Sequence, residues 1–340
     1  MNKFIKKNIM YRNYMKKYLI TGITGFAGPH LANLLLENGH NVAGLIRRTN
    51  GMEADILDTV TQEVFDSIQF IKGDLTNYQS LNKIFREHSF DGIFHLAAQS
   101  HPPTSFEDPL GTFQTNIIGS ANLIESVISN QPDCKFMFCS TSEVYGNVGM
   151  DGRKIHWEDL LKPSNPYGAS KAATDLYLQE RFNNKFLKGF ITRAFSHTGP
   201  RRGKNFSISS DAYQIAKMKL GLQDRNLLVG NLSTTRVVMD VRDTVNAYYL
   251  AMINPKVEND IFNVCGDTPR EMNYFTDKLI EISGLKNVSK KKHDLFWRPH
   301  EIYYQHGDSS NLIKTTGFKE KFNIDTTLSD LLEYWIKKLS

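Results

Sequence analysis

The sequence predicts an α/β protein in which a doubly wound parallel sheet carries a smaller, mostly C-terminal α/β domain. Up to about Phe195, short apolar segments alternate with segments of helical periodicity, a pattern typical of a parallel sheet covered by helices on both faces. A glycine-rich run at residues 21–28 lies between the first apolar segment and the first helix-like one, as in Rossmann-like sheets. Beyond Phe195 the alternation becomes irregular, which indicates the second domain.

The positions of these segments predict the individual elements. We expect a first strand over 17–21 and, after the glycine run, a helix over 29–38 with leucines along one side. The sheet domain continues with expected strands at 42–46, 68–71, 92–96 and 135–139, and helices at 79–87 and 112–128. Beyond Phe195 we expect helices at 210–220, 238–252, 272–283 and 328–338, and strands at 227–229 and 261–264.

Composition excludes several classes of protein. Of 340 residues, 40% are hydrophobic and the net charge is +5, which is ordinary for a globular chain of one large or two modest domains. No apolar run approaches the roughly 18 residues needed to cross a bilayer, so we expect no membrane partner. Residues 1–14 are basic and lack the apolar core of a secretory signal, so they indicate a disordered tail, or a chain that starts functionally at Met15. We favour both over a nucleic-acid-binding arm.

The cysteines indicate the compartment. Cys134, Cys139 and Cys265 stand in apolar surroundings without metal-ligand spacing, so we expect buried thiols and no metal site. Buried, unpaired thiols favour a reducing environment, and we therefore expect a cytoplasmic protein.

The glycine run has the context of a nicotinamide-dinucleotide site. Gly22 permits the tight turn, Gly25 lets the backbone approach a pyrophosphate, and Gly28 lets the helix pack closely on the strand. The N-terminus of that helix then presents unpaired amide groups to the phosphates. An ordinary glycine-rich turn is the alternative. The other residues expected to bind the cofactor within this turn are Thr24, Phe26 and Ala27.

The end of the second strand predicts which dinucleotide binds. An acidic residue there would bind the ribose diol of NAD, but this chain has Arg47 and Arg48. Two guanidinium groups suit a 2′-phosphate, so NADP is favoured over NAD, with a solvated surface pair or a subunit contact as the alternative. The residues expected to line the adenine and ribose pockets follow the third and fourth strands: Asp74, Leu75, Leu96, Ala97 and Ala98.

A tyrosine–lysine pair carries the expected chemistry. Tyr167 and Lys171 are four residues apart and share one face of a helix, and both are expected to bind the cofactor as well. A nearby cation lowers the pKa of a phenol, and a phenolate can accept the proton of an alcohol while a nicotinamide accepts its hydride. Thr141 and Glu143 follow the 135–139 strand, at the edge where such sheets bind ligands. A loop-capping role for Glu143 and a backbone-bonded Thr141 remain the structural alternatives.

Together these motifs resemble the extended short-chain dehydrogenase/reductase family, and within it the GDP-mannose 4,6-dehydratase group. The resemblance is carried by residues 21–28, 95–101, 140–146, 167–171, 197–203, 229–232, 240–243 and 263–266. It implies an NADP-dependent 4,6-dehydratase in which Tyr167, assisted by Lys171, is the base for oxidation of the sugar at C4. Thr141 would bond the C4 oxygen, and Glu143 would remove the C5 proton and help water leave from C6.

The resemblance also implies the substrate and its contacts. The substrate would be a GDP-linked sugar, and GDP-mannose and GDP-manno-heptose both remain open because Ser196 stands where the group usually has asparagine. Relatives are dimers or tetramers, so a homodimer or homotetramer is expected. The further expected substrate-binding residues are Gln99, Ser100, Ser105, Ser142, Ser196, Arg201, Asn205, Arg236 and Arg298.

Two rival functions and a domain division complete the expectations. A GDP-sugar oxidoreductase, either a 4-keto-6-deoxy reductase or a C4 dehydrogenase, would use the same scaffold. A non-catalytic NADP-binding regulator would need only the dinucleotide pocket. We expect residues 15–195 and 236–266 to form the dinucleotide-binding domain, and residues 196–235 and 267–340 to form the nucleotide-sugar domain.

Overall fold

The computed structural model describes residues 15–47, 52–293, 296 and 301–340. Its centre is a seven-stranded sheet in the order β11-β6-β5-β4-β1-β2-β3, in which every neighbouring pair is parallel. The strands are β1 (Lys17–Thr21), β2 (Asn41–Ile46), β3 (Ile68–Lys72), β4 (Gly92–His95), β5 (Lys135–Thr141), β6 (Gly189–Ala194) and β11 (Asp260–Val264). The expected doubly wound α/β fold is confirmed.

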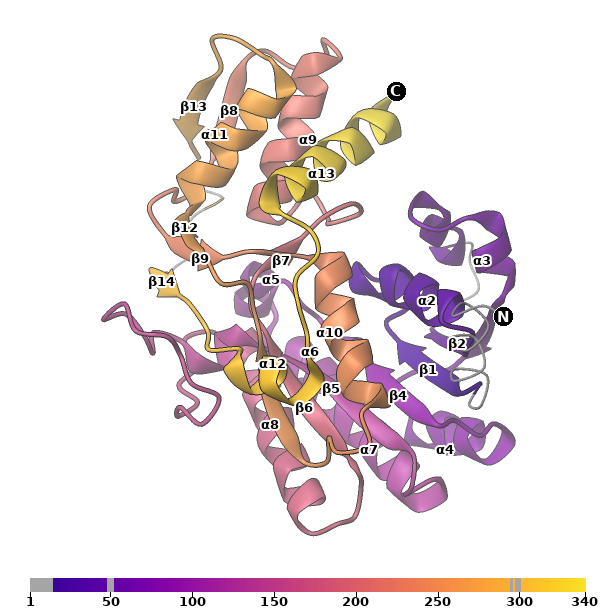
Figure 1. Cartoon of the computed structure of the whole chain (residues 1–340). Helices are drawn as coiled ribbons and strands as arrows, with labels where there is room; N and C mark the ends of the chain where they lie inside the picture. The colour runs from indigo at the N-terminus through magenta and orange to yellow at the C-terminus, as the bar shows by residue number, and fades with distance from the viewer. Residues whose placement is uncertain (1–14, 48–51, 294–295, 297–300) are drawn as a thin grey trace, which may run out of the picture.

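Helices cover both faces of this sheet (Figure 1). One layer contains α2 (Ala27–Glu37), α10 (Val241–Ile253) and α12 (Ser310–Thr316), and the opposite layer contains α4 (Tyr78–Glu87), α7 (Gly119–Asn130) and α8 (Pro166–Asn183). Alternate side chains of each strand enter opposite layers, as the pleat requires, so Ile20 packs with α2 while Leu19 packs with α4. Both faces are buried, which explains why the strands are apolar throughout rather than alternating.

The strand order places the carboxyl ends of β1, β4 and β5 next to one another. β1 pairs with β2 on one side and with β4 on the other, so the chain direction across the sheet reverses at β1. Thr21 lies beside His95, and His95 lies beside Phe138 of β5. In open parallel sheets, ligands bind outside the carboxyl ends of the strands at such a reversal.

The second domain is built on a separate core. It contains α9 (Ser207–Lys219), α11 (Met272–Ser283), α13 (Ile324–Leu339), β8 (Asn226–Val229) and β13 (Ser289–Lys292), which lie together at the top of Figure 1. Trp335 of α13 packs in this core and donates its indole N–H to the hydroxyl oxygen of Ser209 at 2.9 Å. Small strands connect the domains, namely β7 (His197–Thr198) with β10 (Met239–Asp240), and β9 (Thr235–Val237) with β12 (Pro269–Glu271) and β14 (Tyr304–Gln305).

Most expected strands and helices are present, and three segments differ from the expectation. The segment expected as one helix over 112–128 is divided into α6 (Pro109–Phe113), a π-helical turn at Gln114–Ile118 and α7. The segment 238–252 becomes helical at Val241, because Asp240 caps α10 by accepting from the amide of Arg242 at 2.7 Å. Residues 310–318 were expected in the second domain but pack on the sheet domain. Their Leu312 and Phe318 side chains lie in the core beside α2 and α10.

Asp211 in the second-domain core makes stability depend on pH. It is buried, the Thr276 hydroxyl donates to it at 2.7 Å, and burial raises its pKa from 3.8 to about 7. The folded state therefore favours the neutral acid. Its contribution is fully present below pH 4 and is lost as pH rises through 7, a loss of about 2–4 kcal/mol.

Asp211→Asn should therefore stabilise the protein at pH 8 relative to wild type, and change stability less at pH 4. Denaturant unfolding at the two pH values measures this, with the exposed Asp224→Asn as the matched control. An effect of Asp211→Asn that is the same at both pH values would contradict the assignment.

Candidate active site

The glycine turn joins β1 to α2 in a tight backbone arch. Gly22 has a φ of +74°, and a Cβ at this position would lie 2.8 Å from the amide nitrogen of Ala97 at the end of β4. A Cβ on Gly28 would lie 2.5 Å from the carbonyl oxygen of Ile23, so the first turn of α2 rests directly on the arch. Gly25 is exposed at the tip, and its amide donates to Gly22 O at 2.9 Å. Backbone without side chains at the N-terminus of a helix can approach a pyrophosphate closely and is therefore suited to bind one.

The floor beside the arch is the end of β4. Leu96, Ala97 and Ala98 are partly exposed there, and the Ala97 amide donates to the Thr21 hydroxyl at 3.3 Å. Thr21 also bonds His95 at 2.7 Å, and burial lowers the pKa of that histidine to about 3. His95 is therefore neutral and holds the strand ends together.

The residues expected on the adenine side follow β2 and β3. Leu75 is buried, and its carbonyl oxygen accepts from Asn122 at 2.9 Å. Asp74 accepts from the amide and hydroxyl of Thr76 at 2.9 Å, so its carboxylate shapes the turn after β3. Arg47 is exposed directly after β2. Arg48, the second arginine of the expected 2′-phosphate site, lies outside the described residues.

Asn165 connects Glu143 to the start of the helix that carries Tyr167, and sequence reasoning missed it. It caps α8 by accepting from the Gly168 amide at 2.7 Å, and its side-chain amide donates to Glu143 at 2.6 Å. Glu143 lies in a short 3-10 turn, Ser142–Tyr145, directly after β5. One buried amide therefore fixes the carboxylate of Glu143 relative to the first turn of the helix that carries Tyr167. An asparagine directly before a proline at a helix start was the available signal.

Burial and a nearby arginine both act on the pKa of Tyr167. Burial is the largest influence and raises the pKa of this phenol well above its ordinary value, while its hydrogen bond with Thr141 and the charge of Arg202 act in the opposite direction. The Lys171 ammonium lies 4.0 Å from the centre of the Phe138 ring, and burial lowers the pKa of Lys171 to about 8. Arg202, which sequence reasoning did not select, is thus a cation that lowers the pKa of this phenol. That Lys171 lowers it as well stays a prediction.

The helix carrying this pair is anchored by a buried salt bridge. Asp175, one turn beyond Lys171, is buried and accepts two bonds from Arg193 of β6, each 2.9 Å long. The same guanidinium donates to Tyr145 at 2.9 Å and to the carbonyl oxygen of Trp157 at 2.6 Å. This network fixes α8 against the strand that lies beside β5.

Asp175→Ala should cost about 3–5 kcal/mol of unfolding free energy, because it leaves the Arg193 charge buried without its partner. Chemical denaturation measures this. The double variant Asp175→Leu with Arg193→Met removes both charges and should lose less than the single variant. A double variant that is less stable than Asp175→Ala would show that the pair stabilises the fold by itself.

The structure divides the expected substrate residues into two groups. Gln99, Ser105 and Ser142 use their side chains inside the protein: Gln99 bonds Thr112 at 3.0 Å, Ser105 accepts from the Tyr167 amide at 3.0 Å, and Ser142 bonds Gln305 at 3.2 Å. These three support the site rather than extend from it. Those with side chains at the surface are Ser100 and Asn205, which are exposed, and Ser196, which is partly exposed.

The three expected arginines occupy different positions. Arg236 is buried beside Glu301, with a nitrogen–oxygen distance of 3.6 Å, and it donates to the carbonyl oxygen of Ile302 at 2.5 Å. Arg201 contacts the glycine turn itself, donating to the carbonyl oxygens of Thr24 and Gly25. Arg298 lies outside the described residues.

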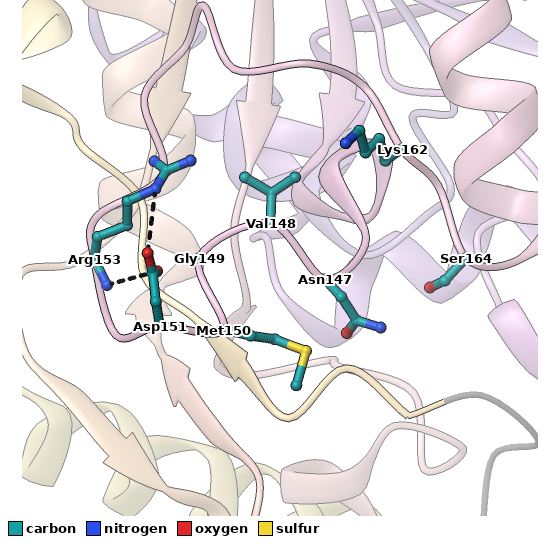
Figure 2. Close-up of a pocket in the computed structure, with 8 residues that line it drawn as sticks. All are labelled: Asn147, Val148, Gly149, Met150, Asp151, Arg153, Lys162 and Ser164. Atoms are coloured by element: carbon teal, nitrogen blue, oxygen red, sulfur yellow. Dashed lines mark hydrogen bonds and ion pairs between the residues drawn. The ribbon is translucent and has the colours of Figure 1, made fainter.

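A hollow of about 460 Å³ lies in the loop between the Glu143 turn and α8 (Figure 2). Asn147, Lys162 and Ser164 line one part of it, and Arg153 faces Asp151 at the opposite rim with a nitrogen–oxygen distance of 3.8 Å. None of the expected catalytic residues lines this hollow, so it is separate from the arrangement of Thr141, Glu143 and Tyr167. Within the described part of the chain, no cluster of metal-ligating side chains occurs and no helix is long and apolar enough to cross a bilayer.

A glycine arch and a buried tyrosine–lysine helix at the carboxyl edge of one parallel sheet are the arrangement of the extended short-chain dehydrogenase/reductase class. Within that class, the chain belongs to the GDP-mannose 4,6-dehydratase family, whose family model matches residues 19–331. The family expected from the motifs is confirmed.

Individual relatives agree with this placement. GDP-6-deoxy-D-mannose reductase of Pseudomonas aeruginosa is 29% identical over 94% of this chain and 97% of that protein. GDP-mannose 4,6 dehydratase 1 of Arabidopsis thaliana is 28% identical over 93% of this chain and 88% of its own length. Among solved structures, RMD from Pseudomonas aeruginosa complexed with NADPH has a TM-score of 0.81 and 27% identity, covering 95% of this chain and 98% of its own.

Proposed function

We propose that the chain is an NADP-dependent GDP-sugar 4,6-dehydratase that converts GDP-mannose or GDP-manno-heptose to the 4-keto-6-deoxy sugar. The observation that carries the proposal is the Asn165 bridge, which holds the Glu143 carboxylate at the start of the Tyr167 helix. An oxidation at C4 needs a phenol and a dinucleotide, whereas loss of water from C5 and C6 needs this additional base. Family membership and the similarity to GDP-mannose 4,6 dehydratase 1 of Arabidopsis thaliana support the same reaction class.

The residues have the following roles in the proposed reaction. Tyr167 accepts the proton of the C4 hydroxyl, and the Thr141 hydroxyl, which bonds the phenol, holds the C4 oxygen. Bound NADP supplies the hydride acceptor for C4 and the hydride donor for C6. The ketone at C4 acidifies the C5 hydrogen, so that the Glu143 carboxylate can remove it as a proton. Glu143 then gives that proton to the C6 hydroxyl, which leaves as water. After reduction at C6, Glu143 passes a proton from solvent to C5, and Tyr167 releases to solvent the proton that it took from the C4 hydroxyl.

The choice of NADP rests on Arg47 and on the NADPH-bound relative. Arg47 is exposed where β2 ends, where a 2′-phosphate would lie, and charge-assisted bonds to phosphate are strong. RMD from Pseudomonas aeruginosa, which shares this fold, was solved with NADPH. We also infer a homodimer or homotetramer from analogy with the family. A cytoplasmic location is inferred from the three free cysteines.

The second candidate is a GDP-sugar oxidoreductase on the same scaffold. It is favoured by the similarity to GDP-6-deoxy-D-mannose reductase along nearly the whole of both chains. Such an enzyme would consume cofactor in each turnover, whereas a dehydratase regenerates it.

Product mass separates the two candidates. The purified protein is incubated with GDP-mannose or GDP-manno-heptose and a trace of NADP, and separately with the GDP-4-keto-6-deoxy sugar and stoichiometric NADPH. Loss of one water from the sugar, with no net change in NADPH absorbance, supports the dehydratase. Gain or loss of two hydrogens in proportion to added cofactor supports the oxidoreductase, and NADP binding without turnover of either sugar would revive a purely regulatory protein.

A further inference from the structure

We propose that Arg201 is a positioning residue for the dinucleotide, through which the loop leading to the second domain holds the phosphate-binding turn in shape. This proposal rests on the proposed dinucleotide site. It also gives a new role to Arg201, which the sequence suggested as a ligand of the GDP-sugar. Arg201 lies in the loop between β7 and α9, far in sequence from the turn that it contacts.

The guanidinium of Arg201 donates hydrogen bonds to the backbone of the sheet domain. Its Nη2 donates to Thr24 O at 3.0 Å, its Nη1 donates to Gly25 O, and its Nε donates to Asp55 O at 3.1 Å. All three acceptors are backbone carbonyl oxygens. Bonds to the carbonyl side of the arch fix the orientation of its peptide planes, and therefore the direction of its amide groups. A charged donor makes these bonds stronger than neutral ones.

The loop that carries Arg201 is itself fixed on both sides. Arg201 has a φ of +73°, a left-handed conformation that costs a non-glycine residue energy and that the surrounding contacts must hold. The preceding residue, Pro200, presents its carbonyl oxygen to His30 of α2 at 3.0 Å. The following residue, Arg202, lies 4.8 Å from the ring of Phe26 in the glycine turn and 3.5 Å from the ring of Phe206 before α9.

The third acceptor extends the contact to the segment after Arg47. Asp55 belongs to the 3-10 turn Met52–Asp58, and Asp58 at its end bonds Lys338 and accepts from the Tyr334 hydroxyl at 3.3 Å. Lys338 and Tyr334 lie on α13 of the second domain. The glycine turn and the segment that follows the proposed 2′-phosphate site are thus both tied to residues outside the sheet domain.

These contacts predict that Arg201 affects binding of the dinucleotide rather than binding of the guanine nucleotide. Three of the five N–H groups of Arg201 are used on carbonyls of the cofactor turn and its neighbour, so removing them should loosen the amide cradle. Dinucleotide affinity should fall, while binding of the guanine nucleotide should be preserved. Because the contact joins the domains, the affinity for NADPH is then set partly by a residue of the interdomain loop.

The test compares binding of two probes to the full-length chain. Arg201→Gln removes the charge and the planar set of guanidinium donors. Arg201→Lys keeps the charge but reduces the number of carbonyl oxygens that the side chain can reach. NADPH affinity is measured by nicotinamide fluorescence, and GDP affinity by calorimetry with NADPH saturating. The matched control is Arg225→Gln, since Arg225 is an exposed arginine of the second domain that also donates to a backbone carbonyl, that of Lys286.

We expect Arg201→Gln to weaken NADPH binding about tenfold or more and Arg201→Lys to weaken it less, with GDP affinity within about twofold of wild type. Arg225→Gln should change neither affinity. Weaker GDP binding with normal NADPH binding would overturn the proposal and return Arg201 to the substrate site. Unchanged NADPH binding in both variants, or equal weakening of both ligands, would overturn it as well. Failure of wild type to bind NADPH would instead refute the dinucleotide site itself. Should Arg201→Gln fail to fold, the Arg201→Lys affinities decide by the same criteria.

Discussion

Tyr167→Phe should lower turnover of the GDP-sugar by about 10²–10⁴-fold, because it removes the one oxygen that can accept the C4 proton at the start of the reaction. The phenol is buried and bonds the Thr141 hydroxyl, so phenylalanine fills the same space and loses a single polar atom. Both the oxidation at C4 and every later step depend on this transfer. Steady-state product formation, followed by mass, measures the loss.

Three companion measurements make the result specific. NADPH affinity and the unfolding midpoint of Tyr167→Phe should remain near wild type, since the helix is held by Asn165 and Asp175 rather than by the phenol. Tyr177→Phe is the matched control on the same helix, where the hydroxyl donates to Glu125 away from the sheet edge. Full activity in Tyr167→Phe would remove the phenol from the mechanism.

Glu143→Gln should separate the two halves of the reaction. Glutamine keeps the side-chain oxygen that accepts from Asn165, so the turn after β5 should retain its shape while the proton-accepting carboxylate is lost. Oxidation at C4 should continue, and elimination of water should slow by about 10²–10⁴-fold. A 4-keto sugar that retains its C6 oxygen should then accumulate together with NADPH absorbance.

Exchange with solvent provides the sharpest readout for Glu143. In deuterated water, wild type should place deuterium at C5 of the product, whereas Glu143→Gln should show little exchange. The exposed Glu158→Gln, in the loop before α8, serves as the control. Normal elimination in Glu143→Gln would assign the C5 proton to another group, and loss of oxidation together with elimination would show a structural role.

Local sequence was sufficient for six of the seven strands of the sheet, and β6 (Gly189–Ala194) was not foreseen. The strand at 17–21 was predicted to the residue, because an apolar run ended by a glycine turn leaves few alternatives. The helix over 272–283 was equally well defined, since Gly284 with a φ of +72° ends it. The broken helix between Pro109 and Asn130 was not foreseen, because a π-helical turn has no periodicity distinct from that of its flanks.

Domain membership was harder to predict than the elements themselves. The stretch 236–266 was expected to return to the sheet domain, and α10 and β11 do lie there. Residues 310–318 do so as well, and no local pattern separates a helix that packs on α10 from one that packs on α13. Which core an apolar face joins is decided by long-range packing.

The residues alone determined the family, the parallel sheet, and the chemistry available at the ends of β1, β5 and the start of α8. They did so because glycine, tyrosine, lysine and glutamate have backbone freedom or acid–base behaviour that few other residues share. Only the tertiary structure decided what each charge faces. Lys171 lies over Phe138, Arg202 acts on Tyr167, and Arg201 holds the glycine turn, because the strength of a charge depends on distance and burial across contacts far apart in sequence.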